Sequence, residues 1–210
     1  LRSALQDAGI GPAGWGAGRR TGLLAYGSNA APSQLRRKFP DAARRAIPVT
    51  AVEVADVDVV FSAHLTSYGS LPATIHRTPG ARAHLAITWL DDEERSIMHR
   101  TEGGNYRLEE VPGLPSVFAY VSDHGVIPLG GAPRGLSAAV VTGSRRRRLG
   151  QAEAIAAAAR DYFPGHDARS VSLRAIADPA WRRRATRTLA DNALPARLGE
   201  GPAIAPADLV

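Results

Sequence analysis

Short apolar or alternating stretches follow one another between residues 21 and 121 and predict a series of β-strands. Three apolar residues lead into a polar turn at Tyr26, so we expect a short buried strand over residues 21–25. Residues 47–65 are rich in β-branched side chains and alternate in part, which is typical of a long or bent pair of strands. Four further strands are expected at residues 73–76, 83–89, 105–111 and 116–121.

Helical signals also occur between the strands, and they dominate the end of the chain. Pro32, with Leu35 and Phe39 spaced four apart, predicts a short helix that ends before Pro40. A longer helix is expected over residues 144–163, and a last one opens at Asp178-Pro179, which is a good N-cap and first-turn pair.

The inserted helix begins at an acidic cap. Asp91 followed three residues later by Glu94 resembles a capping box, and Gly103-Gly104 is expected to end the helix. Glu102 therefore lies at or just past the helix end.

The order of these elements predicts an α+β fold around a largely antiparallel or mixed sheet, because strands come first and most helices come late. Residues 1–20 carry several glycines and no sustained period, so we expect an N-terminal arm there. The core is expected over residues 21–143, with a helical extension over 144–210 packed on it.

Composition indicates an ordinary globular protein, since 44% of the residues are hydrophobic and 22% are charged. The absence of cysteine excludes disulfides, thiolate metal sites and cysteine nucleophiles. No apolar run reaches the roughly 20 residues of a spanning helix, and polar breaks at Arg2, Gln6 and Asp7 leave no visible signal peptide. We expect a soluble, cytoplasmic protein without a membrane partner.

The net charge of +6 raises the question of nucleic-acid binding. Lys38 is the only lysine, so the basic side chains are almost all arginine, and alanine is abundant as well. A GC-rich coding sequence makes both arginine and alanine abundant without selection for phosphate contacts. We therefore do not expect nucleic acid as the partner, and an arginine-rich nucleic-acid accessory protein is kept as the third hypothesis.

The turn at Tyr26, Gly27, Ser28 and Asn29 is the first candidate site. Glycine at a strand end lets the backbone bend, so that the successive amide groups of residues 27–29 are able to point at one anion. The alternative is an ordinary strand-to-helix turn in which Asn29 or Ser33 only caps the helix.

Glu102 is the second candidate. A single carboxyl beside glycines, at a helix end and ahead of a buried strand, suits proton transfer when it is partly withdrawn from water. The alternative is a solvated residue at a helix end.

These motifs in this order resemble the γ-glutamylcyclotransferase-like superfamily over about residues 22–121. In that family a Tyr-Gly-Ser motif ends the first strand, matched here by Tyr26–Asn29, and the catalytic glutamate precedes a glycine, matched by Glu102. The tyrosine that follows is matched by Tyr106, and a tyrosine on the next strand by Tyr120. The segment SLPATI, residues 70–75, is a looser match to the family's Pro-containing strand.

The resemblance implies a small barrel-like sheet with helices outside it and a reaction without metal or organic cofactor. The α-amino group of a γ-glutamyl compound attacks its own side-chain carbonyl, and 5-oxoproline and an amine are released. Glu102 would act as general acid/base and residues 26–29 would hold the α-carboxylate, while Tyr106 and Tyr120 would bind the substrate. The partner would be a small molecule with a γ-glutamyl or similar carboxylate group.

Other kinds of site have weaker sequence support. The six histidines show no H-E-x-x-H pairing, so a metal site would have to be assembled in three dimensions. No G-x-S-x-G elbow occurs, which leaves Ser28 a poor candidate nucleophile. A non-catalytic or differently acting domain of the same fold, which binds an acidic small molecule or supports a partner, stays open as the second reading.

Overall fold

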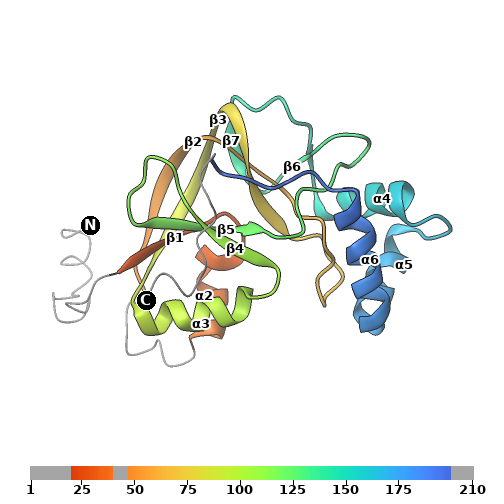
Figure 1. Ribbon diagram of the computed structural model, residues 1–210, viewed down its shortest axis with the longest axis horizontal. Helices are drawn as coiled ribbons and strands as arrows, with labels where there is room; N and C mark the ends of the chain where they lie inside the picture. Colours follow the sequence, from red (N-terminus) through yellow and green to blue (C-terminus); the bar gives the residue numbers. More distant parts are fainter. Residues whose placement is uncertain (1–19, 40–46, 200–210) are drawn as a thin grey trace. The chain divides into compact units, whose positions relative to one another are not determined.

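The computed structural model of the chain describes residues 20–39 and 47–199 (Figure 1). They fall into two compact units: unit 1 holds the described residues of 20–52 and 85–120, and unit 2 those of 53–84 and 121–199. The predicted arm lies outside the described residues except for Arg20. The predicted division into arm, core and extension stays a prediction.

Eight strands form one mixed sheet in the order β4-β5-β1-β3-β2-β6-β8, with β7 beside β3. The strands are β1 (Thr21–Ala25), β2 (Val49–Phe61), β3 (Ala73–Leu90), β4 (Tyr106–Glu110), β5 (Val117–Ser122), β6 (Gly135–Leu136), β7 (Val140–Thr142) and β8 (Arg148–Leu149). Strand β1 pairs antiparallel with β3 and parallel with β5. Within the described residues the strand path does not close into a barrel, and five α-helices flank the sheet. The predicted α+β class with a mixed sheet is confirmed.

Unit 1 contains the β1 turn and two of the helices. A short 3₁₀ helix, η1 (Ser28–Ala30), follows the turn and leads into α2 (Pro32–Lys38), as the proline and the apolar spacing predict. Helix α3 (Asp92–Glu102) begins at the predicted capping box, in which Asp91 and Glu94 each accept the other's backbone N–H over 2.9 Å. The apolar core of this unit is formed by Leu23, Leu35, Phe39, Leu90, Met98, Leu108, Phe118 and Tyr120.

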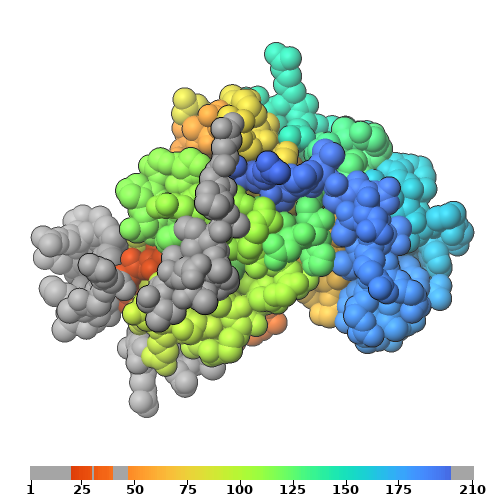
Figure 2. Space-filling view, viewed as in Figure 1, coloured from red at the N-terminus to blue at the C-terminus, as the bar shows by residue number. Residues whose placement is uncertain are grey.

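Unit 2 contains the remaining helices, α4 (Gln151–Tyr162), α5 (Ala168–Ala177) and α6 (Pro179–Asp191). Asp178 caps α6 by accepting the N–H of Trp181 over 2.9 Å, as predicted. Trp181, Ala185 and Leu189 are buried at a spacing of four residues, so one stripe of α6 packs into the core of this unit. Figure 2 shows the three helices, coloured in blues, at the surface of the molecule.

The two strands expected at residues 73–76 and 83–89 are one strand, β3. Gly80 lies in the segment between the two expected strands and has a φ of +81°, which glycine adopts without strain. Its N–H donates to Asp56 Oδ1 over 2.7 Å. The expected strand pair over 47–65 is likewise one strand, β2, which passes Asp56 at a φ of +58°. A local change of backbone conformation therefore bends each strand without ending it.

The helix expected over residues 144–163 begins only at Gln151, so its predicted start is wrong. Arg148 lies instead in β8, where its guanidinium donates to the Leu136 carbonyl and to buried Asp58. These contacts hold Arg148 in the strand, although the sequence of the arginine run is compatible with a helix. Helix α5 and the short strands β6, β7 and β8 were not expected from the sequence.

Candidate active site

The turn after β1 brings a polar side chain next to the end of α3. Gly27 and Ser28 are exposed, and a Cβ built on Gly27 would meet no atom within 4 Å, so the space in front of it is open. The Asn29 backbone carbonyl accepts the Thr88 hydroxyl over 3.2 Å, which ties η1 to β3 within unit 1. This bond fixes the position from which the Asn29 side chain extends.

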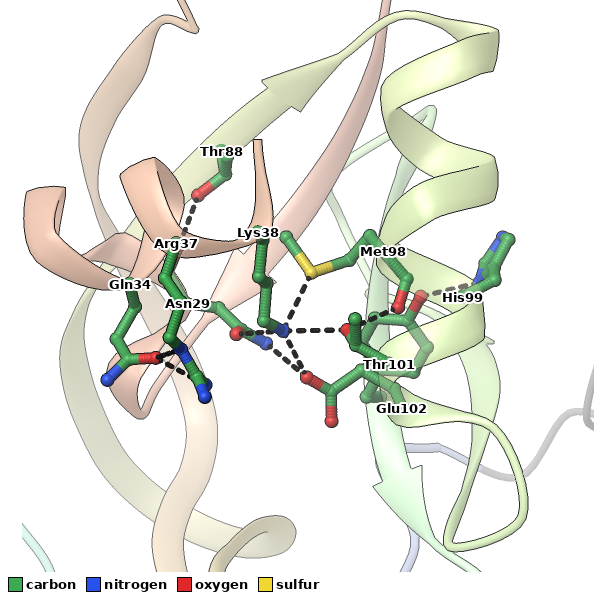
Figure 3. Close-up of polar contacts among 10 residues, drawn as sticks. Asn29, Gln34, Arg37, Lys38, Thr88, Met98, His99, Thr101 and Glu102 are labelled. Atoms are coloured by element: carbon green, nitrogen blue, oxygen red, sulfur yellow. Dashed lines mark hydrogen bonds and ion pairs between the residues drawn. The ribbon is translucent and has the colours of Figure 1, made fainter. Parts of the chain in front are cut away.

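Glu102 is the last residue of α3, and its side chain is 18% exposed. Asn29 Nδ2 donates to Glu102 Oε1 over 3.2 Å, and Lys38 Nζ lies 2.7 Å from the same oxygen (Figure 3). Among the described residues no hydrogen bond to Glu102 Oε2 is found, and Figure 3 draws that oxygen without a contact. One oxygen of the carboxylate is thus held by two donors, and no described hydrogen bond holds the other.

Lys38 comes from the last position of α2, and only 7% of its side chain is exposed. Its ammonium also lies 2.9 Å from Asn29 Oδ1, 2.9 Å from Thr101 Oγ1 and 3.2 Å from Met98 Sδ. Figure 3 shows these contacts converging on Nζ between α2 and α3. The lysine therefore links both helices to the turn after β1.

Two helices end at this cluster, and each helix C-terminus carries partial negative charge from its unpaired carbonyls. Glu102 adds a full negative charge at the end of α3, which is electrostatically unfavourable by itself. The Lys38 ammonium, at the end of α2, offsets these charges in a largely buried position.

The tyrosines form a second group beside the carboxylate. The Tyr26 hydroxyl donates to the Tyr120 carbonyl, and the Tyr120 hydroxyl lies 2.5 Å from His99 Nδ1. Tyr106 packs edge-on against Tyr120, with 6.5 Å between the ring centroids. The three tyrosines are thus joined through Tyr120.

Burial and the negative charge of Glu102 raise the pKa of Tyr120, and burial together with Arg95 lowers the pKa of His99. Both groups are therefore neutral near pH 7, so we assign the Tyr120 hydroxyl as donor and His99 Nδ1 as acceptor. The other ring nitrogen, Nε2, then carries the hydrogen. It is buried and has no hydrogen-bond partner among the described residues.

The structure brings together Asn29 and Glu102, and separately Tyr26, Tyr106 and Tyr120. Gly27 and Ser28 lie in the same turn, but no described contact joins either of them to Glu102. The binding and catalytic roles of these residues stay predictions.

Sequence reasoning did not single out Lys38 or His99, although each contacts a predicted site residue, Glu102 and Tyr120 respectively. One signal was present in the sequence. Lys38 is the only lysine, and every other member of the lysine and arginine set is an arginine.

In the described part of the chain, no group of three or more histidine, aspartate and glutamate side chains is arranged to hold a metal ion. None of the helices found in residues 20–39 and 47–199 has the length and apolarity needed to cross a membrane.

No protein-family model matches the sequence, and no curated protein is significantly similar to it. Among solved structures, the chain is similar to a gamma-glutamyl cyclotransferase, with 13% identity and a TM-score of 0.43 over 88% of this chain and 93% of that chain. It is also similar to an uncharacterized protein from Homo sapiens, with 16% identity and a TM-score of 0.41 over 50% of this chain and 67% of that chain. Likenesses of this strength say nothing about the chemistry of the site.

Proposed function

We propose that this protein is a γ-glutamyl cyclotransferase-like enzyme that releases 5-oxoproline from a γ-glutamyl amine, amino acid or peptide. The substrate is a small molecule with a free α-amino group and an α-carboxylate, and the enzyme acts in the cytoplasm. No cofactor takes part in the proposed reaction.

Glu102 acts as the general acid/base of this reaction. Its carboxylate accepts a proton from the α-ammonium of the substrate, and the freed amine attacks the γ-carbonyl carbon. The new C–N bond closes a five-membered lactam, whose nitrogen gives up a second proton, and the old amide C–N bond breaks. Through Glu102 both protons reach the leaving nitrogen, which departs as an ammonium. Atoms and charges balance without water or a further reactant.

The turn after β1 holds the α-carboxylate through the backbone N–H groups of residues 27–29. Fixing that carboxylate selects the substrate conformer in which the α-nitrogen faces the γ-carbonyl, and orientation of this kind supplies much of the rate gain in an intramolecular reaction. Tyr106 and Tyr120 border the substrate, as the resemblance implies.

One observation carries the proposal: Asn29 of the turn and Glu102 of α3 are in hydrogen-bond contact although 73 positions separate them. The mechanism requires this convergence, because the group that holds the carboxylate and the group that moves the proton must act on one small substrate.

The test is to incubate the protein with a panel of γ-glutamyl amines, amino acids and peptides and to measure 5-oxoproline. Glu102→Gln keeps the shape of the side chain and removes its basicity, so we expect kcat to fall about 100- to 10,000-fold. Glu93→Gln, an exposed glutamate on the first turn of the same helix, is the matched control and is expected to retain activity. Undiminished turnover by Glu102→Gln refutes the assigned role.

A second candidate function is a non-catalytic domain that binds an acidic small molecule. It is favoured by the ion pair itself, since Lys38 and Asn29 already satisfy one oxygen of Glu102. Calorimetric binding of the same γ-glutamyl compounds without 5-oxoproline release would support this function over the first.

A further inference from the structure

Resting on the proposed function, we propose that Lys38 is the positioning residue of the reaction. It fixes Glu102 Oε1, so that Oε2 is the oxygen that exchanges the proton with substrate. The two donors on Oε1 are Lys38 Nζ at 2.7 Å and Asn29 Nδ2 at 3.2 Å. A carboxylate held at one oxygen in this way has little freedom to turn about its last torsion, so its second oxygen keeps one direction.

The lysine is itself held. Asn29 Oδ1 and Thr101 Oγ1 each lie 2.9 Å from Nζ, and Met98 Sδ lies 3.2 Å away. Thr101 is in turn fixed by donating its hydroxyl to the Met98 carbonyl over 2.8 Å. The Lys38 side chain, which would be flexible in water, is therefore immobilised. Because it extends from α2, the position of α2 determines where its ammonium meets the carboxylate at the end of α3.

Charge supports the same assignment. Glu102 stands at the negative end of the α3 dipole, where a carboxylate is disfavoured, and Lys38 supplies the compensating cation at a largely buried site. Arg100 and His99 are the basic residues of the last turn of α3, but no described contact joins either of them to the Glu102 carboxylate. Among the described contacts, the charge compensation at Glu102 comes from α2.

The choice of lysine fits this geometry. An ammonium is a compact charge whose donors are able to converge on acceptors from several directions, whereas a guanidinium is planar and needs more room. Arginine is the usual cation of this chain, so Lys38 departs from its composition at a position where the cation lies between two helix ends.

The alternative role for Lys38 is inhibition of the enzyme. The Lys38 ammonium lies against Glu102 much as the substrate ammonium would, so it would inhibit the enzyme if the substrate had to displace it. The two roles predict opposite signs: removing the ammonium slows a positioned base and accelerates an inhibited one.

The experiment measures kcat and KM for 5-oxoproline release by Lys38→Met, Lys38→Arg and the wild type. We expect Lys38→Met to lower kcat about 100-fold with KM within about threefold of the wild-type value, because a misplaced catalytic group costs turnover more than binding. Lys38→Arg keeps the charge but not the geometry and should recover only part of kcat. Arg37→Met removes the same charge one position away, at an exposed site, and should leave kcat within about twofold.

A chemical rescue separates positioning from general damage to the fold. The chain has no cysteine, so Lys38→Cys creates a single thiol. Alkylation of the unfolded variant with 2-bromoethylamine, followed by refolding, rebuilds an ammonium of nearly the same length, and iodoacetamide gives a neutral side chain. We expect kcat to recover at least tenfold with the first reagent and not with the second.

The outcomes distinguish the two proposals. If the wild type releases no 5-oxoproline from any compound of the panel, the proposed function fails and this inference fails with it. If the wild type is active and Lys38→Met has an unchanged or higher kcat, or if both alkylated forms are equally slow, only the positioning role is overturned.

Discussion

The side-chain amide of Asn29 donates to Glu102 and accepts from Lys38, so one residue of the first turn contacts both members of the buried ion pair. The amide is suited to this place because it offers a donor and an acceptor at once. A residue with only one of these functions would lose either the contact with the carboxylate or the contact with the ammonium.

Asn29→Asp tests this relationship. The substitution keeps the size of the side chain, removes the N–H that points at Glu102, and places a second carboxylate about as close as the present 3.2 Å contact. We expect kcat to fall about 10- to 100-fold, since the two carboxylates repel each other and compete for Lys38. Steady-state 5-oxoproline release measures the effect, with Gln34→Glu on α2 as a control that should remain active.

Tyr120→Phe distinguishes support of the fold from contact with substrate. Loss of the hydroxyl removes the partner of His99 Nδ1, so we expect the free energy of unfolding to fall by about 1–3 kcal/mol in urea titrations. If the hydroxyl is committed to His99, KM for the γ-glutamyl substrate should change by less than about twofold. A tenfold rise in KM would show that the hydroxyl binds substrate.

His64 makes stability dependent on pH in unit 2. Burial and the neighbouring His124 lower its pKa from 6.5 to about 3. Between these two pH values, His64 is protonated in the unfolded chain and neutral in the folded chain. The free energy of unfolding therefore falls by about 1.4 kcal/mol per pH unit as the pH drops from about 6.5 toward 3. Above the unfolded pKa, His64 has no such effect.

His64→Gln removes the titrating ring but retains an acceptor for Ser62, which lies 2.7 Å from His64 Nδ1. Between pH 8 and pH 5, the variant should lose about 2 kcal/mol less stability than the wild type. Urea unfolding at several pH values measures the difference, and parallel curves for the two proteins would contradict the prediction.

Asp58 is fully buried in unit 2, and its carboxylate accepts from Arg148 over 3.2 Å and from Ser144 over 2.6 Å. Asp58→Asn leaves the guanidinium without its counter-charge and should cost about 3–5 kcal/mol of unfolding free energy. Glu53→Gln breaks an exposed pair with Arg82 and should cost less than about 1 kcal/mol. Similar losses in both variants would show that burial does not set the cost.

The ends of several elements were predictable because their signals lie within a few residues of them. The capping box at Asp91 and Glu94, the Asp178 cap of α6 and the Pro32 start of α2 each satisfy backbone groups of the adjacent turn. The β1 strand and the polar turn after it follow from the same local chemistry.

Tertiary contacts decided the rest. Whether Gly80 ends a strand or bends one depends on Asp56, which accepts its N–H, and whether the arginine run is helical depends on Asp58, which lies 90 positions before Arg148. The sequence by itself determined the candidate glutamate and the candidate turn, because each has a local pattern. Only the tertiary structure determined that Lys38 pairs with Glu102 across 64 positions. The attraction between the two charges depends on their distance and on their burial, and the residues next to either one in the sequence set neither quantity.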